Sequence, residues 1–312
     1  MMSKIDQYIH AATRENTRIS YQSAIRHFEE TWEGFLPATA DSVTRYLANY
    51  ADTLTISTLK LRLAALSQWH IDQGFPDPTK ASMVKKVLKG IKELHPAQVK
   101  QAKPLKIDQL EQLAIWMDER IEKAKAAADH KMLLTQTRNK ALVLIGFWRG
   151  FRSDELSRLQ AEHIQLVPGE GMTIFLPRSK GDRQNLGQEF KVPALSRLCP
   201  INAYQEWILL TGMRVGPVFF GINRWGQISD RALNPNSIIM LLKGLFRDAG
   251  LPDADSFSSH SLRRGFASWA SDHQWDIKLL MEYVGWRDIK SAMRYIDTSD
   301  NLVKNRIERA LE

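Results

Sequence analysis

The C-terminal part of the chain contains side chains that could act together on a phosphate ester. His260 and Arg263 lie three residues apart in HSLRRG, and Tyr295 follows in SAMRYID. Tyrosine has a free pKa of about 10, so its hydroxyl becomes a nucleophile beside a proton acceptor or in a positive field. Cationic neighbours would also bind the phosphate oxygens. These residues therefore predict nucleophilic attack on a phosphate.

The start of a predicted helix would bring His260 and Arg263 to one side of the chain. Ser258 or Ser259 could cap that helix, leaving backbone N–H groups and the positive end of the helix dipole beside the two side chains. Such a corner suits a phosphate. The alternative interpretation is a surface arginine and a hydrogen-bonded core histidine.

Further candidate residues lie upstream and downstream of this corner. Arg152 and Glu155 show the same three-residue spacing, and the acid could orient the guanidinium toward a ligand. Lys180 lies in SKG at a predicted hairpin tip, and Trp286 follows Gly285. Each also has a structural interpretation: an intrahelical ion pair, a solvated turn lysine and a core aromatic. Tyr295 could likewise be a packing residue.

The elements that would position these residues are mainly helical. Apolar spacing predicts helices over residues 17–32, 42–50, 55–73, 80–94, 107–128 and 138–148, and a helical turn over 151–159. Between residues 163 and 192, MTIFLP and EFKVP predict a β-hairpin, and the chain is helical again from residue 200 except for loops near 215–229 and 251–259. The expected fold is mainly α with a small antiparallel β-sheet. We expect a helical domain over 1–95, a basic linker over 96–106 and a second domain over 107–312.

Composition and charge restrict the function further. A net charge of +8 favours polyanions such as nucleic acid, although charge alone does not decide the partner. Cys199 is the only cysteine, so an intrachain disulfide and a cysteine-rich zinc module are excluded. No apolar run is long enough to cross a bilayer, and the N-terminus is too polar for a signal peptide. We expect a reducing, cytoplasmic location and no membrane partner.

Motifs for nucleotide or metal binding are absent from the sequence. It contains no GxxxxGK[ST], HExxH, CxxC pair or GxSxG. We therefore expect chemistry that uses no cofactor and no metal.

In chain order, Arg152, Lys180, His260, Arg263, Trp286 and Tyr295 resemble the signature of the tyrosine recombinase (phage integrase) family. GFRSDEL is similar to the first arginine box of the family and HSLRRGFAS to the second, while VGWRDIKSAMRY is similar to the segment that leads to the nucleophile. TISTLKLRLAALSQWH and GFPDPT resemble the helical core-binding domain, so the resemblance extends over almost the whole chain. Trp286 stands where most members have histidine, as in the Cre-like branch.

This resemblance implies a Cre/Xer-like site-specific recombinase with a core-binding domain and an α+β catalytic domain that form a C-shaped clamp on DNA. It implies that Tyr295 is the nucleophile, that Arg152 and Arg263 hold the phosphate, and that His260 handles a proton. Lys180 is implied as the general acid, with Lys191 as the alternative, and Glu155 as support for Arg152. Indole cannot shuttle protons, so Trp286 would orient the phosphate or Tyr295.

The implied partner is double-stranded DNA with paired recombination sites, bound by a homotetramer in which the C-terminal tail packs on a neighbouring protomer. Candidate DNA contacts are Lys60, Arg62, Lys85, Lys86, Lys89 and Lys103. The location would be the nucleoid of a bacterium, with the chain encoded by the bacterium or a phage. Two alternatives stay open: a type IB topoisomerase-like DNA-relaxing enzyme, and a catalytically silent DNA-binding regulator.

Overall fold

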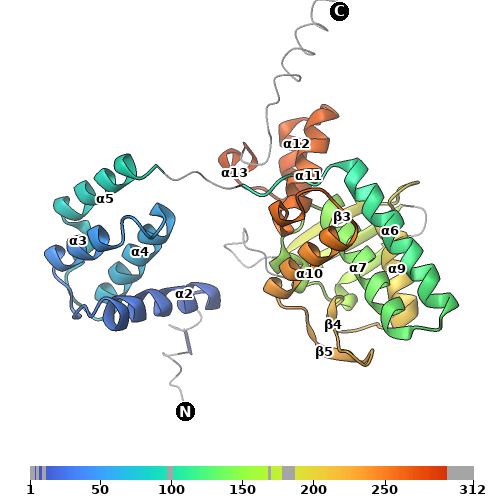
Figure 1. Cartoon of the computed structure of the whole chain (residues 1–312), viewed down its shortest axis with the longest axis horizontal. Coiled ribbons are helices and arrows are strands. Elements are labelled where there is room, and N and C mark those ends of the chain that lie inside the picture. The colour runs from blue at the N-terminus through green and yellow to red at the C-terminus, as the bar shows by residue number, and fades with distance from the viewer. Residues whose placement is uncertain are drawn as a thin grey trace, which may run out of the picture. The chain divides into compact units, whose positions relative to one another are not determined.

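Two separate hydrophobic cores organise the chain. The computed structural model describes residues 12–96, 101–167, 170–177 and 187–293, together with Lys4, Gln7 and Tyr8. The chain divides into a first unit, residues 1–100, and a second unit, residues 101–312, each with its own core cluster. Figure 1 labels most of the α-helices and three of the strands, β3, β4 and β5.

The first unit is helical. Its elements are α2 (Glu15–Arg26), η1 (His27–Thr31), α3 (Ala40–Asn49), α4 (Ile56–Asp72), η2 (Pro78–Lys80) and α5 (Ser82–Leu94). Thr39 and Thr55 cap α3 and α4, because each side chain accepts a hydrogen bond from a backbone N–H of the first turn. Phe28, Tyr46 and Leu59 are fully buried and join η1, α3 and α4. The four helices predicted for this region are confirmed to within a few residues.

The second unit combines helices with two small sheets. Its elements are α6 (Ile107–Ala126), α7 (His130–Trp148), α8 (Ser153–Ser157), η3 (Ala161–His163), β1 (Ile164–Val167), β2 (Gly171–Leu176), β3 (Gln188–Pro193), α9 (Pro200–Thr211), β4 (Phe220–Ile222), β5 (Ile228–Ala232), α10 (Pro235–Asp248), η4 (Ala254–Ser256), α11 (Ser259–Asp272), α12 (Ile277–Val284) and α13 (Ile289–Met293). The fold class predicted from the sequence, mainly α with small antiparallel sheet, is confirmed.

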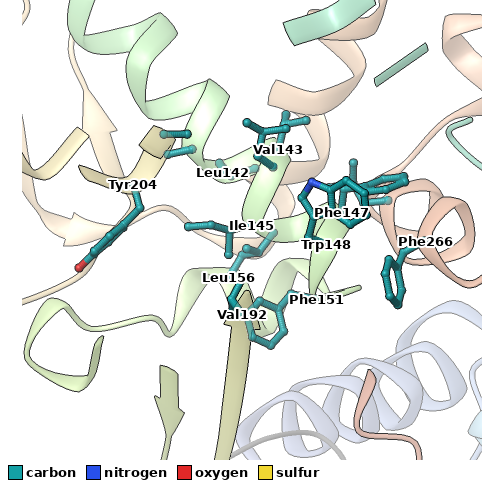
Figure 2. Packing of buried hydrophobic residues seen from close by; sticks show 14 of the residues in the cluster. Leu142, Val143, Ile145, Phe147, Trp148, Phe151, Leu156, Val192, Tyr204 and Phe266 are labelled. Carbon is teal, nitrogen blue, oxygen red and sulfur yellow. The ribbon is translucent and has the colours of Figure 1, made fainter. Parts of the chain in front are cut away.

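Helix α7 lies at the centre of the second core. Every residue from Ala141 to Trp148 is buried, as its apolar sequence predicts. Figure 2 shows this part of α7 with Val192 of β3 and Phe266 of α11 among the side chains around it. Each fully buried Leu, Ile or Phe contributes about 1.5–3 kcal/mol to folding. The end of α7 is therefore a rigid support for the residues that follow it.

The predicted β-hairpin is confirmed as β2 and β3, and β1 extends it to a three-stranded antiparallel sheet. Ile174 pairs with Phe190 and Thr173 with Lys191. Phe190 and Val192 face the core, whereas Glu189 and Lys191 are exposed on the other face, as the two-residue period of a strand requires.

The loop predicted near residues 215–229 was partly wrong, because β4 and β5 form a second hairpin there. The Asn223 side chain accepts hydrogen bonds from the backbone N–H groups of Trp225 and Gln227, so the five residues between the strands make a tight turn.

Residues 101–106, within the predicted linker, pack against the rest of the second unit, to which they belong. The N–H groups of Lys103 and Leu105 donate to the carbonyls of Ser256 and Ser261 at 3.1 and 3.0 Å, and Leu105 is fully buried. Gly265 permits this approach, because a Cβ there would lie 2.1 Å from the Leu105 carbonyl oxygen.

In the part of the chain that the structure describes, no helix is long and apolar enough to span a membrane.

Candidate active site

Arg152 is held at the start of α8 by a carboxylate of the same helix. Glu155 accepts a hydrogen bond from the backbone N–H of Arg152 at 2.8 Å and another from its Nη1 at 2.7 Å. Glu155 is buried, whereas about a quarter of the Arg152 side chain is exposed. One bond from the backbone and one from the guanidinium, both to the same carboxylate, fix Arg152 while its side chain stays accessible to a ligand.

Arg263 reaches the same carboxylate from α11. It is fully buried, donates to the Gly150 carbonyl at 2.6 Å, and lies 3.8 Å from Glu155. Gly150 has a φ of 57° and lies against Arg263 and Val284, so the turn after α7 is close to both α11 and α12. The structure thus brings together two arginines that are separated by more than a hundred residues.

His260 lies in the first turn of α11 and is exposed. The Ser258 side chain accepts from the His260 N–H at 3.2 Å, and the Ser261 side chain accepts from the Ser258 N–H at 2.9 Å. This reciprocal cap is the one expected at the corner. The alternative of a core histidine and a surface arginine is reversed in the structure, since His260 is exposed and Arg263 is buried.

Trp286 packs on Arg263. It is buried, and its ring centroid lies 4.9 Å from the guanidinium carbon of Arg263. Gly285, with a φ of 75°, ends α12 and lets it approach β3, because a Cβ there would lie 3.1 Å from Gln188 and 3.2 Å from Phe190. A cation over an indole face is a favourable contact in a dry environment.

Lys180 and Tyr295 lie outside the residues that the structure describes. The described chain ends on either side of Lys180 at Pro177 and Gly187, and before Tyr295 at Met293. Lys191 is described and is exposed on the face of β3 opposite to Phe190, the residue that lies next to Gly285.

Arg149 is a buried residue near the site, and it is not one of the residues in the family signature. It ends α7, three residues before Arg152, and only 2% of it is exposed. Its guanidinium donates to the carbonyls of Lys191 and Tyr283. The sequence signal was a charged residue directly after an apolar helix, in FWRGFR.

The candidate DNA contacts of the first unit fall into two classes. Lys60, Lys85, Lys86 and Lys89 are exposed, as is Lys103 in the second unit, although Lys103 pairs with Asp253 at 2.6 Å. Arg62 instead points to the interior of the first unit. Its Nη1 lies 2.5 Å from His27 Nδ1 and donates to the Tyr46 hydroxyl at 2.7 Å, which gives it a structural role.

Within the described ranges, no three His, Cys, Asp or Glu side chains gather as the ligands of a metal ion would.

The chain is similar to several known proteins. The model of the phage integrase family matches residues 121–301. The chain is 30% identical over 279 residues to an integrase/recombinase xerD homolog of Selenomonas ruminantium, covering 88% of this chain and 78% of that protein. It is 24% identical over 281 residues to recombinase cre of Escherichia phage P1, covering 86% and 78%.

Two solved structures share the fold. A Tn1549 transposon integrase in complex with circular intermediate DNA superposes with a TM-score of 0.61 at 14% identity, covering 95% of this chain and 94% of the other. A XerH site-specific recombinase bound to difH substrate gives a TM-score of 0.58 at 19% identity, covering 95% and 79%.

Proposed function

The chain belongs to the phage integrase family of site-specific tyrosine recombinases, which cleave and rejoin DNA, and from this premise we propose that Tyr295 attacks a DNA phosphate held between Arg152 and Arg263. The single observation that carries the proposal is the buried Glu155 carboxylate, which lies 2.7 Å from one guanidinium and 3.8 Å from the other. Two guanidiniums around one carboxylate leave a net positive charge, which would attract a phosphate.

Each arginine would contact the non-bridging oxygens and stabilise the charge that gathers on them in the transition state. Removing a preorganised donor of this kind typically costs about 3–4 kcal/mol of transition-state stabilisation. The burial of Arg263 and the two bonds on Arg152 preorganise these donors before DNA arrives. Their positive charge would supply the electrostatic stabilisation at the phosphate.

The reaction exchanges one phosphate ester for another. The Tyr295 oxygen forms a bond to phosphorus, the bond to the 5′-oxygen breaks, and a 3′-phosphotyrosyl ester results. His260 takes up the tyrosine proton and Lys180 donates a proton to the leaving 5′-oxygen. A second 5′-hydroxyl then attacks the phosphotyrosine and reverses the steps on a new partner. No external energy source is needed, because the ester bond is retained throughout.

Trp286 would position Arg263 and take no part in proton transfer. Its indole has one N–H donor and no acceptor, so it cannot pass a proton from one group to another. The contact between its ring and the Arg263 guanidinium supports this role.

The partners follow from the same premise. DNA is the substrate, and we infer a homotetramer that assembles on two paired recombination sites at the nucleoid. Residues 1–95 would form the core-binding domain and 107–312 the catalytic domain. Phosphate contacts would come from a set of exposed lysines that comprises Lys60, Lys85, Lys86, Lys89 and Lys103. Recombination between two sites distinguishes this proposal from DNA relaxation and from silent binding, neither of which is favoured by the relatives.

The test is capture of the covalent intermediate. A nicked duplex that carries the recombination site, mapped by sequencing recombination junctions, should form a covalent adduct with the wild-type chain. Tyr295→Phe should form no adduct while binding the duplex with unchanged affinity. The matched control is Tyr204→Phe, which removes a hydroxyl from a buried tyrosine of α9 and should leave the adduct intact. An adduct with Tyr295→Phe would overturn the assignment.

A further inference from the structure

We propose that Arg149 is a positioning residue that holds three parts of the catalytic site in register: the turn that carries Arg152, the strand β3 and the end of α12. The inference rests on the proposed function, since it concerns the arrangement of that site. Arg149 would touch neither DNA nor the reacting atoms, because its guanidinium donates to the carbonyls of Lys191 and Tyr283 and packs on the rings of Phe190 and Tyr283.

The contacts of Arg149 reach all three elements. Its Nη1 donates to the Lys191 carbonyl of β3 at 3.1 Å, and its Nη2 donates to the Tyr283 carbonyl in the last turn of α12. Its guanidinium carbon lies 3.9 Å from the ring centroid of Tyr283 and 4.8 Å from that of Phe190. One planar group therefore joins the end of α7 to β3 and α12.

Each of these elements leads directly to a residue of the proposed site. Arg149 precedes Gly150, whose carbonyl binds Arg263, and Arg152 follows two residues later. Strand β3 follows the connection from β2 that contains Lys180, and α12 ends at Gly285, before Trp286. A shift of about 1 Å in such supports can cost roughly a hundredfold in rate.

Arginine is suited to this place for physical reasons. Its guanidinium presents five donors in a fixed plane, which can serve two carbonyls in different directions while the faces of the plane pack on rings. A cation near the C-terminal carbonyls of α12 is also favoured by the helix dipole. Lysine has all its donors on one nitrogen and no planar face, so it could not pack on the two rings as the guanidinium does.

The charge of Arg149 adds to the field at the phosphate. Burial lowers the pKa of Arg149, while the Tyr283 side chain and the Glu155 carboxylate act against that shift. Among the described residues, no carboxylate forms an ion pair with Arg149, and its Nε has no hydrogen-bond partner. Glu155 is thus attracted by three guanidiniums, those of Arg149, Arg152 and Arg263.

The experiment compares Arg149→Met and Arg149→Lys with a matched buried arginine of α7. Arg138 is also buried, and it donates to Asn139 and to the Phe220 carbonyl of β4, away from the site. Single-turnover adduct formation on the nicked duplex is measured at saturating protein, together with DNA affinity and the thermal midpoint of each full-length variant. Arg138→Met should lower the midpoint and keep the wild-type rate.

Arg149→Met should slow adduct formation by about tenfold to a hundredfold at unchanged DNA affinity, with Arg149→Lys intermediate. A duplex with a 5′-bridging sulfur should reduce the defect, because its leaving group needs no proton and so depends less on the hairpin. A purely structural role would not produce this recovery.

Wild-type rates in folded Arg149→Met would overturn the inference. If that variant does not fold, the rate of Arg149→Lys decides, and a wild-type value there would overturn it equally. These outcomes are separate from failure of the proposed function, which would appear as no adduct with the wild-type chain or a persistent adduct with Tyr295→Phe.

Discussion

At the scale of single residues, one carboxylate orients both arginines of the site. Glu155 is 5% exposed and carries hydrogen bonds from the Arg152 backbone and side chain, with Arg263 at 3.8 Å. A buried charge is tolerated only when it is paired and hydrogen-bonded, and here cations from two helices meet that requirement. The same carboxylate lowers the positive charge available to the phosphate, so orientation and attraction are opposed.

This opposition predicts different effects on binding and on cleavage in Glu155→Gln. The amide removes a negative charge, so DNA affinity should stay equal or rise. The loss of charge-assisted bonds to Arg152 should slow adduct formation by roughly 10–100-fold, which corresponds to about 1.5–3 kcal/mol. Affinity and single-turnover rate are measured on the same nicked duplex.

The control is Glu122→Gln, which neutralises an exposed acid in a pair of the same three-residue spacing with Lys125. It should change neither quantity, because exposed pairs contribute little. A wild-type cleavage rate in Glu155→Gln would show that the carboxylate does not orient Arg152.

At the scale of elements, a cluster around Arg62 joins three elements of the first unit. Arg62 of α4 contacts His27 of η1 and Tyr46 of α3, and its guanidinium carbon lies 5.6 Å from the ring centroid of Tyr50. Burial and the neighbouring Arg62 lower the pKa of His27. A protonated imidazole would place a second cation beside the guanidinium.

The lowered pKa of His27 should make the folded chain less stable at acidic pH. Since the folded-state pKa of His27 lies below the unfolded value of about 6.5, the unfolded chain binds more protons as the pH falls, and stability decreases below about pH 6.5. The loss should level off once the pH is below the folded-state pKa. His27→Gln should lose less stability between pH 7.5 and 5 than the wild type, as measured by thermal unfolding of the full chain. Parallel losses in the two proteins would contradict this account.

Local sequence patterns predicted the helices and strands better than they predicted which distant residues pack against them. Helical spacing located α4 and α5 to within two residues, because it reports one apolar face of a local segment. The burial of Leu105 depends on Ser261 and Gly265, which are more than 150 residues away, and no local pattern encodes it.

In the site, too, the sequence predicted local contacts but not contacts between distant elements. The spacing of Arg152 and Glu155 predicted their contact, since residues three apart on a helix are neighbours. The inward turn of Arg62 and the bridge made by Arg149 both depend on aromatic rings from other elements. An exposed lysine and a buried arginine look alike in charge, so composition alone could not separate them.

At the scale of the whole molecule, part of the net charge of +8 is concentrated on one helix, α5. Helix α5 carries Lys85, Lys86 and Lys89, all exposed, while Val84 and Ile91 on the same helix are buried. The apolar face holds α5 to the first unit and leaves the lysines exposed, and we predict that they bind phosphates. The clamp formed by two units on DNA stays a prediction, and the contribution of α5 to it can be measured.

Replacing Lys85, Lys86 and Lys89 together by alanine should weaken DNA binding and make it less dependent on salt. Each phosphate contact contributes about 0.9 to the slope of log affinity against log salt, so three lost contacts should lower the slope by about 3. The cleavage rate at saturating protein should stay at the wild-type value, because these lysines position the chain without contacting the scissile phosphate.

The control removes the same total charge from the second unit by replacing Lys123, Lys125 and Lys131, which are exposed on α6 and at the start of α7. If only the net charge mattered, the salt slope would change equally in the two triple variants. If the lysines of α5 contact phosphates, the salt slope should change only in the α5 variant, since condensed counterions are released where lysines meet phosphates. Equal slopes in both variants would remove α5 from the DNA-binding surface and leave the charge of the chain as a source of long-range attraction.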